Sequence, residues 1–502
     1  MAESLQALAE AAQKLSAGGK FLQAAEKYDE ILKLNDEIAE VHLNKGVVLS
    51  KAGEDVDALE AFREAAKLKP ELVGAHLNEG IMLKRLQRWE EAEDAFRRVV
   101  DREPDQASAW ANMVLALNAM NEHEAALRTA NEAVNAGHRG HPDIHNERIL
   151  ALFKLRRADD AIEDVEALLE SKPMEQQGDT ERNLYSMILM SHGCKLLSNG
   201  DNQEAESYLE RACEGHESAV NLFPYGVCLG NQHKDDEAIP VLEKAMALDP
   251  SNWRIPVMLA TIYMRQKKFD KASEFFERAL KQDEAKKDAN LNFNYAVALM
   301  NTGRESEAKE PLEMVASVDP TNHQALGLLG TVFLQENDFP NAVETLEKAA
   351  KLPGAKEDSS IFYNLGYAKL MNDRPEEALE GFEASLKINP DNEQAKTAVK
   401  ALRPEVLDGS KRVSRRDIAD AASAAARERG SVNGKRISRR ELERLALDSR
   451  SPLERAKLLL GAQRPAYLRR KSMQDLFRVG YVNALAGAFD EITAENIARP
   501  TY

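Results

Sequence analysis

The sequence predicts an all-α protein in which a long solenoid of antiparallel helix pairs precedes a small helical domain. Apolar residues make up 43% of the chain but aromatic residues only 6%, so the aliphatic and small residues that favour helices supply most of the apolar content. An alanine also recurs about every 34 residues from Ala24 to Ala378, a period typical of repeat proteins. The composition then changes at Arg403, where a second domain is expected to begin.

The overall composition limits the classes of protein to consider. The 502 residues allow about three domains or one long repeat array. The chain has only three cysteines, Cys194, Cys213 and Cys228, and no two of them have the CxxC spacing. This argues against a disulfide framework or a Cys-rich zinc site. This use of cysteine predicts a reducing, cytoplasmic setting. The N-terminus has no basic start and no run of about 18 apolar residues occurs, so neither a signal peptide nor membrane insertion is expected.

Four positions recur along the array. The alanine series is Ala24, Ala58, Ala92, Ala126, Ala161, Ala205, Ala238, Ala272, Ala308, Ala342 and Ala378. Twelve residues earlier most repeats have a small residue, as at Gly46, Gly80 and Gly330. Four residues after the alanine lies a bulky partner such as Phe62 or Phe96. A proline that stops a helix follows at Pro70, Pro104, Pro173, Pro250, Pro320 and Pro390.

Each repeat is therefore expected to form two antiparallel helices. The small residue and the alanine let the two backbones approach closely, and the aromatic residue is expected to fill the space between one repeat and the next. In repeats 4 and 5, Val114 and Ile149 replace the small residue, and Ala130 replaces the aromatic one in repeat 4. Looser packing is expected there.

These residues resemble the signature of the tetratricopeptide repeat (TPR) family, in which a small residue, Ala, an aromatic residue and Pro recur. The resemblance covers eleven units, with repeats 1–5 in residues 5–175 and repeats 6–11 in residues 186–392. It implies a superhelical solenoid whose first helices line a concave, protein-binding groove. Residues 393–402 look like the polar capping helix that closes such arrays.

One interval in the alanine series is longer than the others, with 44 residues between Ala161 and Ala205. The extra residues lie around the polar sequence EQQGDTERN, so residues 176–185 are expected to form an insertion loop that divides the array into two stacks. A longer helix with a surface loop explains the interval equally well.

The resemblance implies that the sixth position of each repeat faces the groove, where this chain has Asn44, Asn78, Asn112, Asn294 and Asn364. A row of amides, which both donate and accept, can pair with the backbone of an extended peptide. Alternatively, these residues bridge neighbouring helices. Leu43, Val47, Leu77 and Ile81 flank them, whereas the carboxylate clamp of chaperone-binding TPR proteins needs Lys and Asn. A chaperone-tail receptor is therefore disfavoured.

Residues 403–502 are expected to form a basic helical domain. They contain 21 Lys+Arg and 13 Asp+Glu, a net charge of +8 that leaves −25 for residues 1–402 within the total of −17. Capping-box spacings at Ser414 with Asp417 and Ser438 with Glu441 help to predict helices at 415–429, 439–448, 452–461 and 473–489. The sequence GSVNGKRIS is interpreted as a turn, because its spacing does not fit a phosphate-binding loop.

The basic face of this domain is expected to bind an acidic component of a larger assembly through Arg412, Arg415, Arg416, Arg436, Arg439, Arg440, Arg469 and Arg470. Nucleic-acid phosphates are the alternative ligand. Ser414, Ser438 and Ser472 lie in contexts that resemble sites of basophilic kinases, although helix capping explains each serine without phosphorylation. The opposite charges also predict that the domain folds back on its own array or on a neighbouring copy, while full solvation of both surfaces is the alternative.

No catalytic motif or cofactor fingerprint stands out. His138, His141 and His145 are interpreted as a loop and helix start rather than a metal site. The sequence therefore predicts a non-catalytic scaffold or adaptor that needs no cofactor and holds partner proteins in its groove. A nucleic-acid-associated or ribonucleoprotein role is the main alternative, and a regulatory subunit of an enzyme is a second one.

Overall fold

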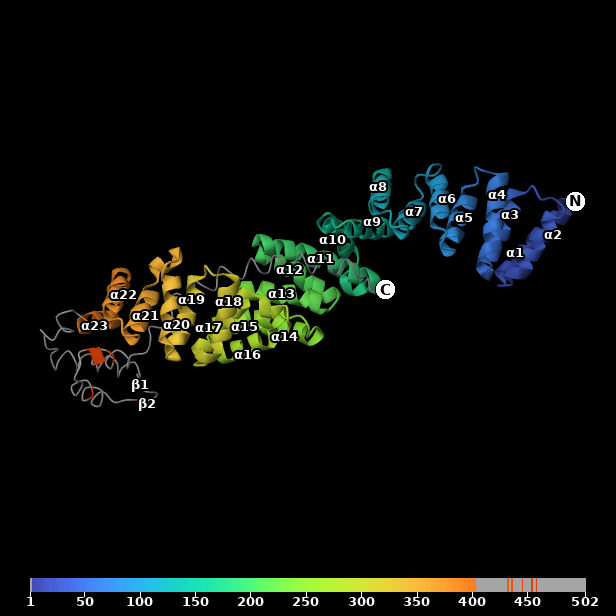
Figure 1. Ribbon diagram of the computed structural model, residues 1–502. Coiled ribbons are helices and arrows are strands. Elements are labelled where there is room, and N and C mark those ends of the chain that lie inside the picture. The colour runs from blue at the N-terminus through green and yellow to red at the C-terminus, as the bar shows by residue number, and fades with distance from the viewer. Residues whose placement is uncertain are drawn as a thin grey trace. The chain divides into compact units, whose positions relative to one another are not determined.

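The computed structural model describes residues 2–402, together with 431–432, 435–436, 445, 453–454 and 457. The described residues form an all-α fold apart from two strands of two residues each, as the sequence predicts (Figure 1). These strands, β1 (Ser431–Val432) and β2 (Lys435–Arg436), pair antiparallel with Ser431 opposite Arg436. They lie within GSVNGKRIS, and their reversal of direction agrees with the turn expected there.

The described residues divide into two compact units, one ending at Tyr225 and the other beginning at Gly226. The boundary falls inside α13 (Ala219–Asn231). The helices of the first unit are α1 (Ala2–Ala17), α2 (Phe21–Leu32), α3 (Ala39–Ala52), α4 (Asp55–Leu68), α5 (Val73–Arg85), α6 (Trp89–Val100), α7 (Ala107–Ala119), α8 (His123–Ala133), α9 (Pro142–Lys154), α10 (Ile162–Ser171), α11 (Asp179–Asn199) and α12 (Asn202–Gly215).

The second unit continues the same order. Its helices are α14 (Asp235–Leu248), α15 (Arg254–Arg265), α16 (Phe269–Ala279), α17 (Ala289–Thr302), α18 (Lys309–Val318), α19 (His323–Gln335), α20 (Phe339–Ala350), α21 (Ser359–Met371), α22 (Pro375–Ile388) and α23 (Glu393–Leu402). Short 3-10 or π turns connect or extend several of them, at Val134–His138, Ala158–Ala161, Met174–Gln176, Ala285–Lys287, Glu305–Ala308 and Pro353–Glu357.

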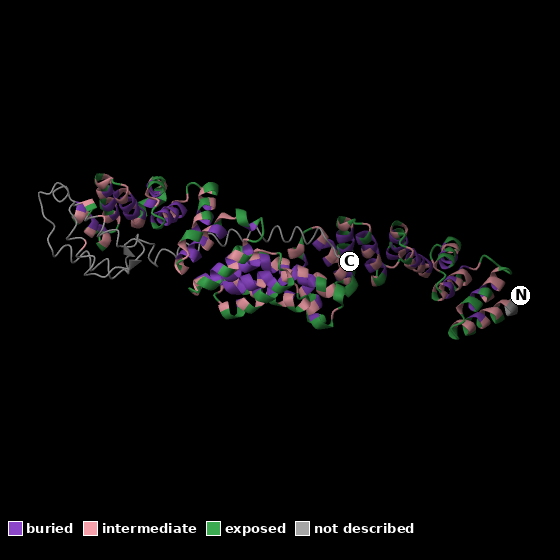
Figure 2. Cartoon of the chain, turned by 60° about the horizontal axis from the view of Figure 1, so that its bottom comes forward, coloured by how far each residue is buried: buried purple, intermediate pink, exposed green. Residues whose placement is uncertain are grey.

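The helices pair as the repeat pattern predicts. Within the units α3 packs on α4, α5 on α6, α19 on α20 and α21 on α22. Each of the eleven alanines in the recurring series is 0% exposed, and buried residues lie where the helices of a pair meet (Figure 2). The prolines also act as predicted, since α4 ends at Leu68 before Pro70 and α22 ends at Ile388 before Pro390.

In the repeats that have a glycine at the small position, the bulky residue packs into the hollow left by that glycine. A Cβ built on Gly46 would lie 2.5 Å from the ring of Phe62, and one on Gly330 would lie 2.4 Å from Cγ of Leu346. This corrects the expectation that the aromatic residue mainly fills the space between repeats. Phe276 also reaches the next repeat, because its ring centroid lies 6.3 Å from that of Tyr295 on α17.

The turn between the two helices of each repeat contains one residue with positive φ. The residues are Gly19, Gly53, Gln87, Asn121, Arg156, Gly200, His233, Lys267, Gly303, Asn337 and Asp373. This left-handed conformation costs little for glycine and more for other residues. Seven of the eleven are not glycine, so the stacking of the helices imposes the turn geometry and a glycine pattern in the sequence could not reveal it.

The long interval is filled mainly by helix. Residues 176–185 were expected to form a loop, but α11 already begins at Asp179 and runs for 21 residues. The first helix of repeat 6 is therefore extended at its N-terminus, and only Gln177 and Gly178 separate it from the turn Met174–Gln176. The division into compact units falls at Tyr225 and Gly226, not at this interval.

The array ends in α23, which matches the predicted range 393–402 and packs on α22. The helices expected at 415–429, 439–448 and 473–489 lie outside the described residues, apart from Leu445. Within the range 452–461, Leu453, Glu454 and Lys457 are helical. Ser414, Ser438 and Ser472 also lie outside the described residues.

Candidate functional site

First helices of successive repeats lie side by side in the first unit, with α3 next to α5 and α7 next to α9. The sixth repeat position therefore recurs on neighbouring helices, at Asn44, Asn78, Asn112 and Glu147, with spacings of 34, 34 and 35 residues. The ninth position recurs in the same way at Val47, Ile81, Leu115 and Leu150. We call these eight residues of α3, α5, α7 and α9 the first-helix surface.

The three asparagines of this surface lie where solvent reaches them. Asn44 is exposed, and Asn78 and Asn112 are half-buried. Nδ2 of Asn78 donates to the carbonyl of Gly74 at 2.7 Å, and Nδ2 of Asn112 donates to the carbonyl of Ser108 at 2.8 Å. These bonds within each helix fix the amide planes and leave a second hydrogen on each Nδ2.

Lys84 links two neighbouring first helices at this surface. It lies on α5, and its Nζ donates to Oδ1 of Asn112 on α7 at 2.5 Å. No sequence pattern marks Lys84, because the contact depends on the stacking of two repeats. A cation next to the row of amides adds a group that can bind a peptide carbonyl or carboxylate.

Glu147 occupies the sixth repeat position on α9 and so continues the row of Asn44, Asn78 and Asn112 with a carboxylate in place of an amide. Nδ2 of Asn118 lies 2.8 Å from the Glu147 carbonyl oxygen and 2.9 Å from Oε2 of its side chain. Burial raises the pKa of the Glu147 carboxyl, while the Asn118 hydrogen bond works in the opposite direction. The position in the repeat was visible in the sequence, but the residue type was not the one sought.

The apolar members of the surface are only partly covered. Val47, Ile81, Leu115 and Leu150 are each half-buried, although they lie on helices whose opposite faces carry fully buried residues such as Met82 and Val114. The surface thus combines amide, carboxylate and partly exposed aliphatic groups.

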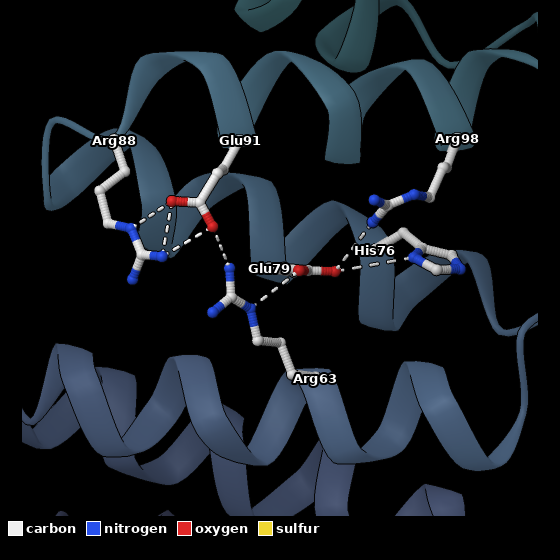
Figure 3. A network of polar contacts seen from close by, with 6 residues as sticks. All are labelled: Arg63, His76, Glu79, Arg88, Glu91 and Arg98. Carbon is white, nitrogen blue, oxygen red and sulfur yellow. Dashed lines mark hydrogen bonds and ion pairs between the residues drawn. The ribbon is translucent and has the colours of Figure 1, made fainter.

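A charged network anchors α5, the helix that carries Asn78. Glu79 is buried on α5 and its carboxylate meets Arg63 of α4 at 3.2 Å and Arg98 of α6 at 3.5 Å (Figure 3). Arg63 also contacts Glu91 at 2.6 Å. The hydrogen bond from Arg88 holds the pKa of the Glu91 carboxyl below its ordinary value. These contacts join repeats 2 and 3 and hold the orientation of α5.

The second unit differs at the same repeat positions. Asn294 on α17 is half-buried. Asn364 on α21 is only 2% exposed, and its Nδ2 donates to Oγ1 of Thr331 on α19 at 3.0 Å. This is the bridging arrangement that the sequence analysis held as the alternative. Met258 and Leu328 at the sixth position are each 2% exposed as well.

Most arginines of the predicted basic face lie in the part of the chain that the structure does not describe. Arg412, Arg415, Arg416, Arg439, Arg440, Arg469 and Arg470 lie outside the described residues, and Arg436 is described only as part of β2. Among the described residues, no group of three or more His, Cys, Asp or Glu side chains is arranged to hold a metal ion. None of the helices in this described part is long and apolar enough to cross a membrane.

Comparisons with known proteins identify the repeats. A tetratricopeptide repeat model matches residues 2–72, 77–142 and 112–175. The TPR domain model of cytochrome c-type biogenesis protein H matches residues 241–360. Together the two models cover more than half of the chain and reach into both compact units.

Three relatives illustrate the range of proteins that share this similarity. The TPR repeat-containing protein YpiA of Bacillus subtilis is 24% identical over 191 residues, 38% of this chain and 44% of that protein. The peroxisomal targeting signal receptor of Saccharomyces cerevisiae is 24% identical over 213 residues, 39% and 33% of the two chains. The protein O-mannosyl-transferase TMTC1 of Homo sapiens is 22% identical over 213 residues, 42% and 20%. The matches span less than half of each relative.

One similar solved structure is that of YrrB, described as a TPR protein with an unusual peptide-binding site. It is 21% identical with a TM-score of 0.36, and the match covers 38% of this chain and 97% of YrrB. MamA matches at 22% identity and a TM-score of 0.33 over 34% of this chain and 93% of that one. The repeat spacing, the helix pairs and the two family models lead to one conclusion: this chain belongs to the tetratricopeptide repeat proteins, whose repeats form protein-interaction scaffolds.

Proposed function

We propose that this protein is a non-catalytic scaffold that binds an extended segment of a partner protein along the first-helix surface. The observation that carries the proposal is the row Asn44, Asn78, Asn112 and Glu147, repeated on adjacent helices beside half-buried aliphatic side chains. Packed helices lie about 8–10 Å apart, and an extended chain rises about 3.3 Å per residue, so one polar group meets roughly every third peptide residue.

This spacing favours recognition of the peptide backbone. Side chains of an extended peptide alternate with a period of two, so a contact at every third residue falls on alternating sides of the chain. The amides then pair with peptide N–H and C=O groups, and Val47, Ile81, Leu115 and Leu150 cover the apolar side chains that face them. When Glu147 is ionised its carboxylate can only accept hydrogen bonds, so it favours an N–H or a basic side chain at its end of the row.

The basic C-terminal region extends the same proposal. Its net charge of +8 supports docking of an acidic component of a larger assembly, so that the scaffold holds two partners at once. We also propose a cytoplasmic location, because a chain with only three cysteines and no CxxC spacing is typical of a reducing compartment.

Selection of random displayed peptides against the full chain tests the first-helix surface. Peptides that bind are then titrated against a variant with Asn44, Asn78 and Asn112 all replaced by alanine. Each lost hydrogen bond weakens binding by about 0.5–1.5 kcal/mol, so the affinity should fall at least about tenfold. Asn131→Ala, an exposed change on the second helix α8, is the matched control and should leave the affinity unchanged.

The triple variant should keep the helical content of the parent chain, because none of the three side chains is fully buried. If the selected peptides bind the triple variant as tightly as the parent chain, the first-helix surface is not the binding site.

A further inference from the structure

The chain returns to its own repeat array after α23. Leu453, Glu454 and Lys457 are helical residues that follow α23 by about 50 residues. Leu453 is half-buried and packs against the hydrophobic core of the second unit, whose last members are Ala395, Ala398 and Leu402. Nζ of Lys457 forms an ion pair with Oδ1 of Asp373. An apolar contact and a charged contact therefore come from residues four apart, which share one helix face.

Asp373 lies in the turn between α21 and α22, the two helices of the last repeat. Its side chain is 74% exposed, whereas that of Lys457 is 23% exposed. The contact is thus formed by a partly covered lysine that reaches a carboxylate at the surface of the turn. Glu376 in the first turn of α22 adds further negative charge near Asp373, whereas Glu377 is paired with Arg374 and Lys369.

Earlier repeats show the same kind of ion pair between one repeat and the next. Arg85 on α5 meets Asp55 at the start of α4 at 2.9 Å, and Lys195 on α11 meets Asp159 at 2.6 Å. Arg265 on α15 pairs with Asp235 at the start of α14. In each case a cation near the end of a first helix contacts a carboxylate at the beginning of the preceding second helix. Lys457 brings a cation to the corresponding edge of the last repeat.

We propose that Leu453 and Lys457 dock on the final repeat of their own chain, at the edge where the turn between α21 and α22 presents Asp373. The α21–α22 turn and the apolar core beside it are then an interaction surface for a helical segment that carries an apolar and a basic side chain four residues apart, and the chain itself supplies that segment. The −25 charge of residues 1–402 against the +8 of residues 403–502 favours the contact over a long range. This surface is separate from the peptide surface proposed for the first unit.

A tethered segment has a large advantage over a free one. Intramolecular linkage gives an effective concentration in about the millimolar range, far above the usual concentration of a second copy. A partner that binds the basic region, or one that offers a better basic helix, must displace this contact. The docked segment thus makes access to the end of the array depend on the acidic component proposed above.

Zero-length carbodiimide cross-linking of the full chain tests the proposal, because the reagent joins a lysine to a carboxylate only when the two are in contact. Mass spectrometry of the monomer should identify a cross-link between Asp373 and Lys457. The pair Lys195 and Asp159, at 2.6 Å in the first unit, is the internal control and should cross-link in every variant.

The Asp373–Lys457 cross-link should be lost in Lys457→Glu and in Leu453→Asp, and should return in the double variant Asp373→Lys with Lys457→Glu, where the charges are exchanged. Failure to detect the cross-link in the parent chain while the control pair reacts would overturn the proposal. A cross-link found only in dimers would overturn it as well, and would assign the surface to a second copy of the chain.

Discussion

At the scale of single residues, the structure gives His145, the last histidine of GHRGHPDIH, a structural role. Nδ1 of His145 lies 2.7 Å from Oδ1 of Asp164, and its Nε2 contacts the carbonyl oxygen of Arg139. Arg148 donates to both oxygens of Asp164, at 2.8 and 2.7 Å. Both ring nitrogens of His145 thus face acceptors, and only the protonated ring can donate to both. The hydrogen bond to Asp164 raises the pKa of His145 above its ordinary value.

This pKa shift predicts how stability depends on pH. A raised pKa in the folded state means that the protein binds a proton more tightly when folded. The stabilisation is complete below the ordinary histidine pKa and is lost as the pH rises through the raised value. The melting temperature of the parent chain should therefore exceed that of His145→Gln most at about pH 5.5, and the difference should shrink towards about pH 8.

His123 provides a control of opposite sign. Burial, with a smaller contribution from Lys154, lowers the pKa of His123. Protonation of this residue therefore opposes folding, and His123→Gln should gain stability relative to the parent chain as the pH falls below the ordinary histidine range. If both variants showed the same pH dependence, the two environments would not have the effects described.

At the scale of elements, the unit of packing is a helix pair with complementary volumes. Gly80 on α5 faces Phe96 on α6, and a Cβ on Gly80 would lie 2.7 Å from the ring. In repeat 4 the order of sizes is reversed, because Val114 on α7 takes the small position and Ala130 on α8 takes the aromatic one. Looser packing was expected in repeat 4, but Val114 and Ala130 are both 0% exposed. Burial at these two positions is therefore as complete as in the other repeats.

Two glycines of the same helix test this account. Gly80→Ala should lower the stability of the first unit, because overpacking costs about 1–3 kcal/mol, more than the gain in helix propensity of at most about 1 kcal/mol. Gly74→Ala is the matched control on α5, since its Cβ would lie 3.9 Å from the nearest atom, on Leu43. It should stabilise the unit by about 0.5–1 kcal/mol. Chemical denaturation measures both, and equal effects would contradict the proposed packing.

At the scale of the whole molecule, each compact unit has its own hydrophobic core. The core of the second unit extends from Val257 to Leu402, and the first unit contains buried residues from Ala12 to Phe223. In repeat proteins each repeat contacts mainly its neighbours, so a local defect spreads over a limited distance. Damage to one unit should therefore leave much of the other intact.

Two alanine substitutions test this independence. Ala92 on α6 and Ala378 on α22 are both 0% exposed and occupy the same repeat position in different units. Ala92→Leu should cost about 1–3 kcal/mol and speed amide hydrogen exchange within the first unit only. Ala378→Leu should do the same in the second unit. Faster exchange in both units with either variant would show that the array unfolds as one body.

The sequence by itself determined the repeats, because their pattern is local and periodic. The alanine series predicted the helix pairs, the prolines predicted where α4 and α22 end, and the polar stretch after Pro390 predicted α23. These features follow from side-chain volume and backbone dihedrals within about one repeat.

Only the tertiary structure decided which polar residues face solvent and which join repeats. Asn78 and Asn364 occupy the same repeat position, yet one is half-buried at the surface and the other bonds to Thr331 of the preceding repeat. The contact of Lys84 with Asn112 joins residues 28 apart in the sequence, and that of Asn118 with Glu147 joins residues 29 apart. The return of Lys457 to Asp373 spans 84 residues. Such contacts depend on how whole helices stack, because the stacking sets both the distance between two distant side chains and the burial of each.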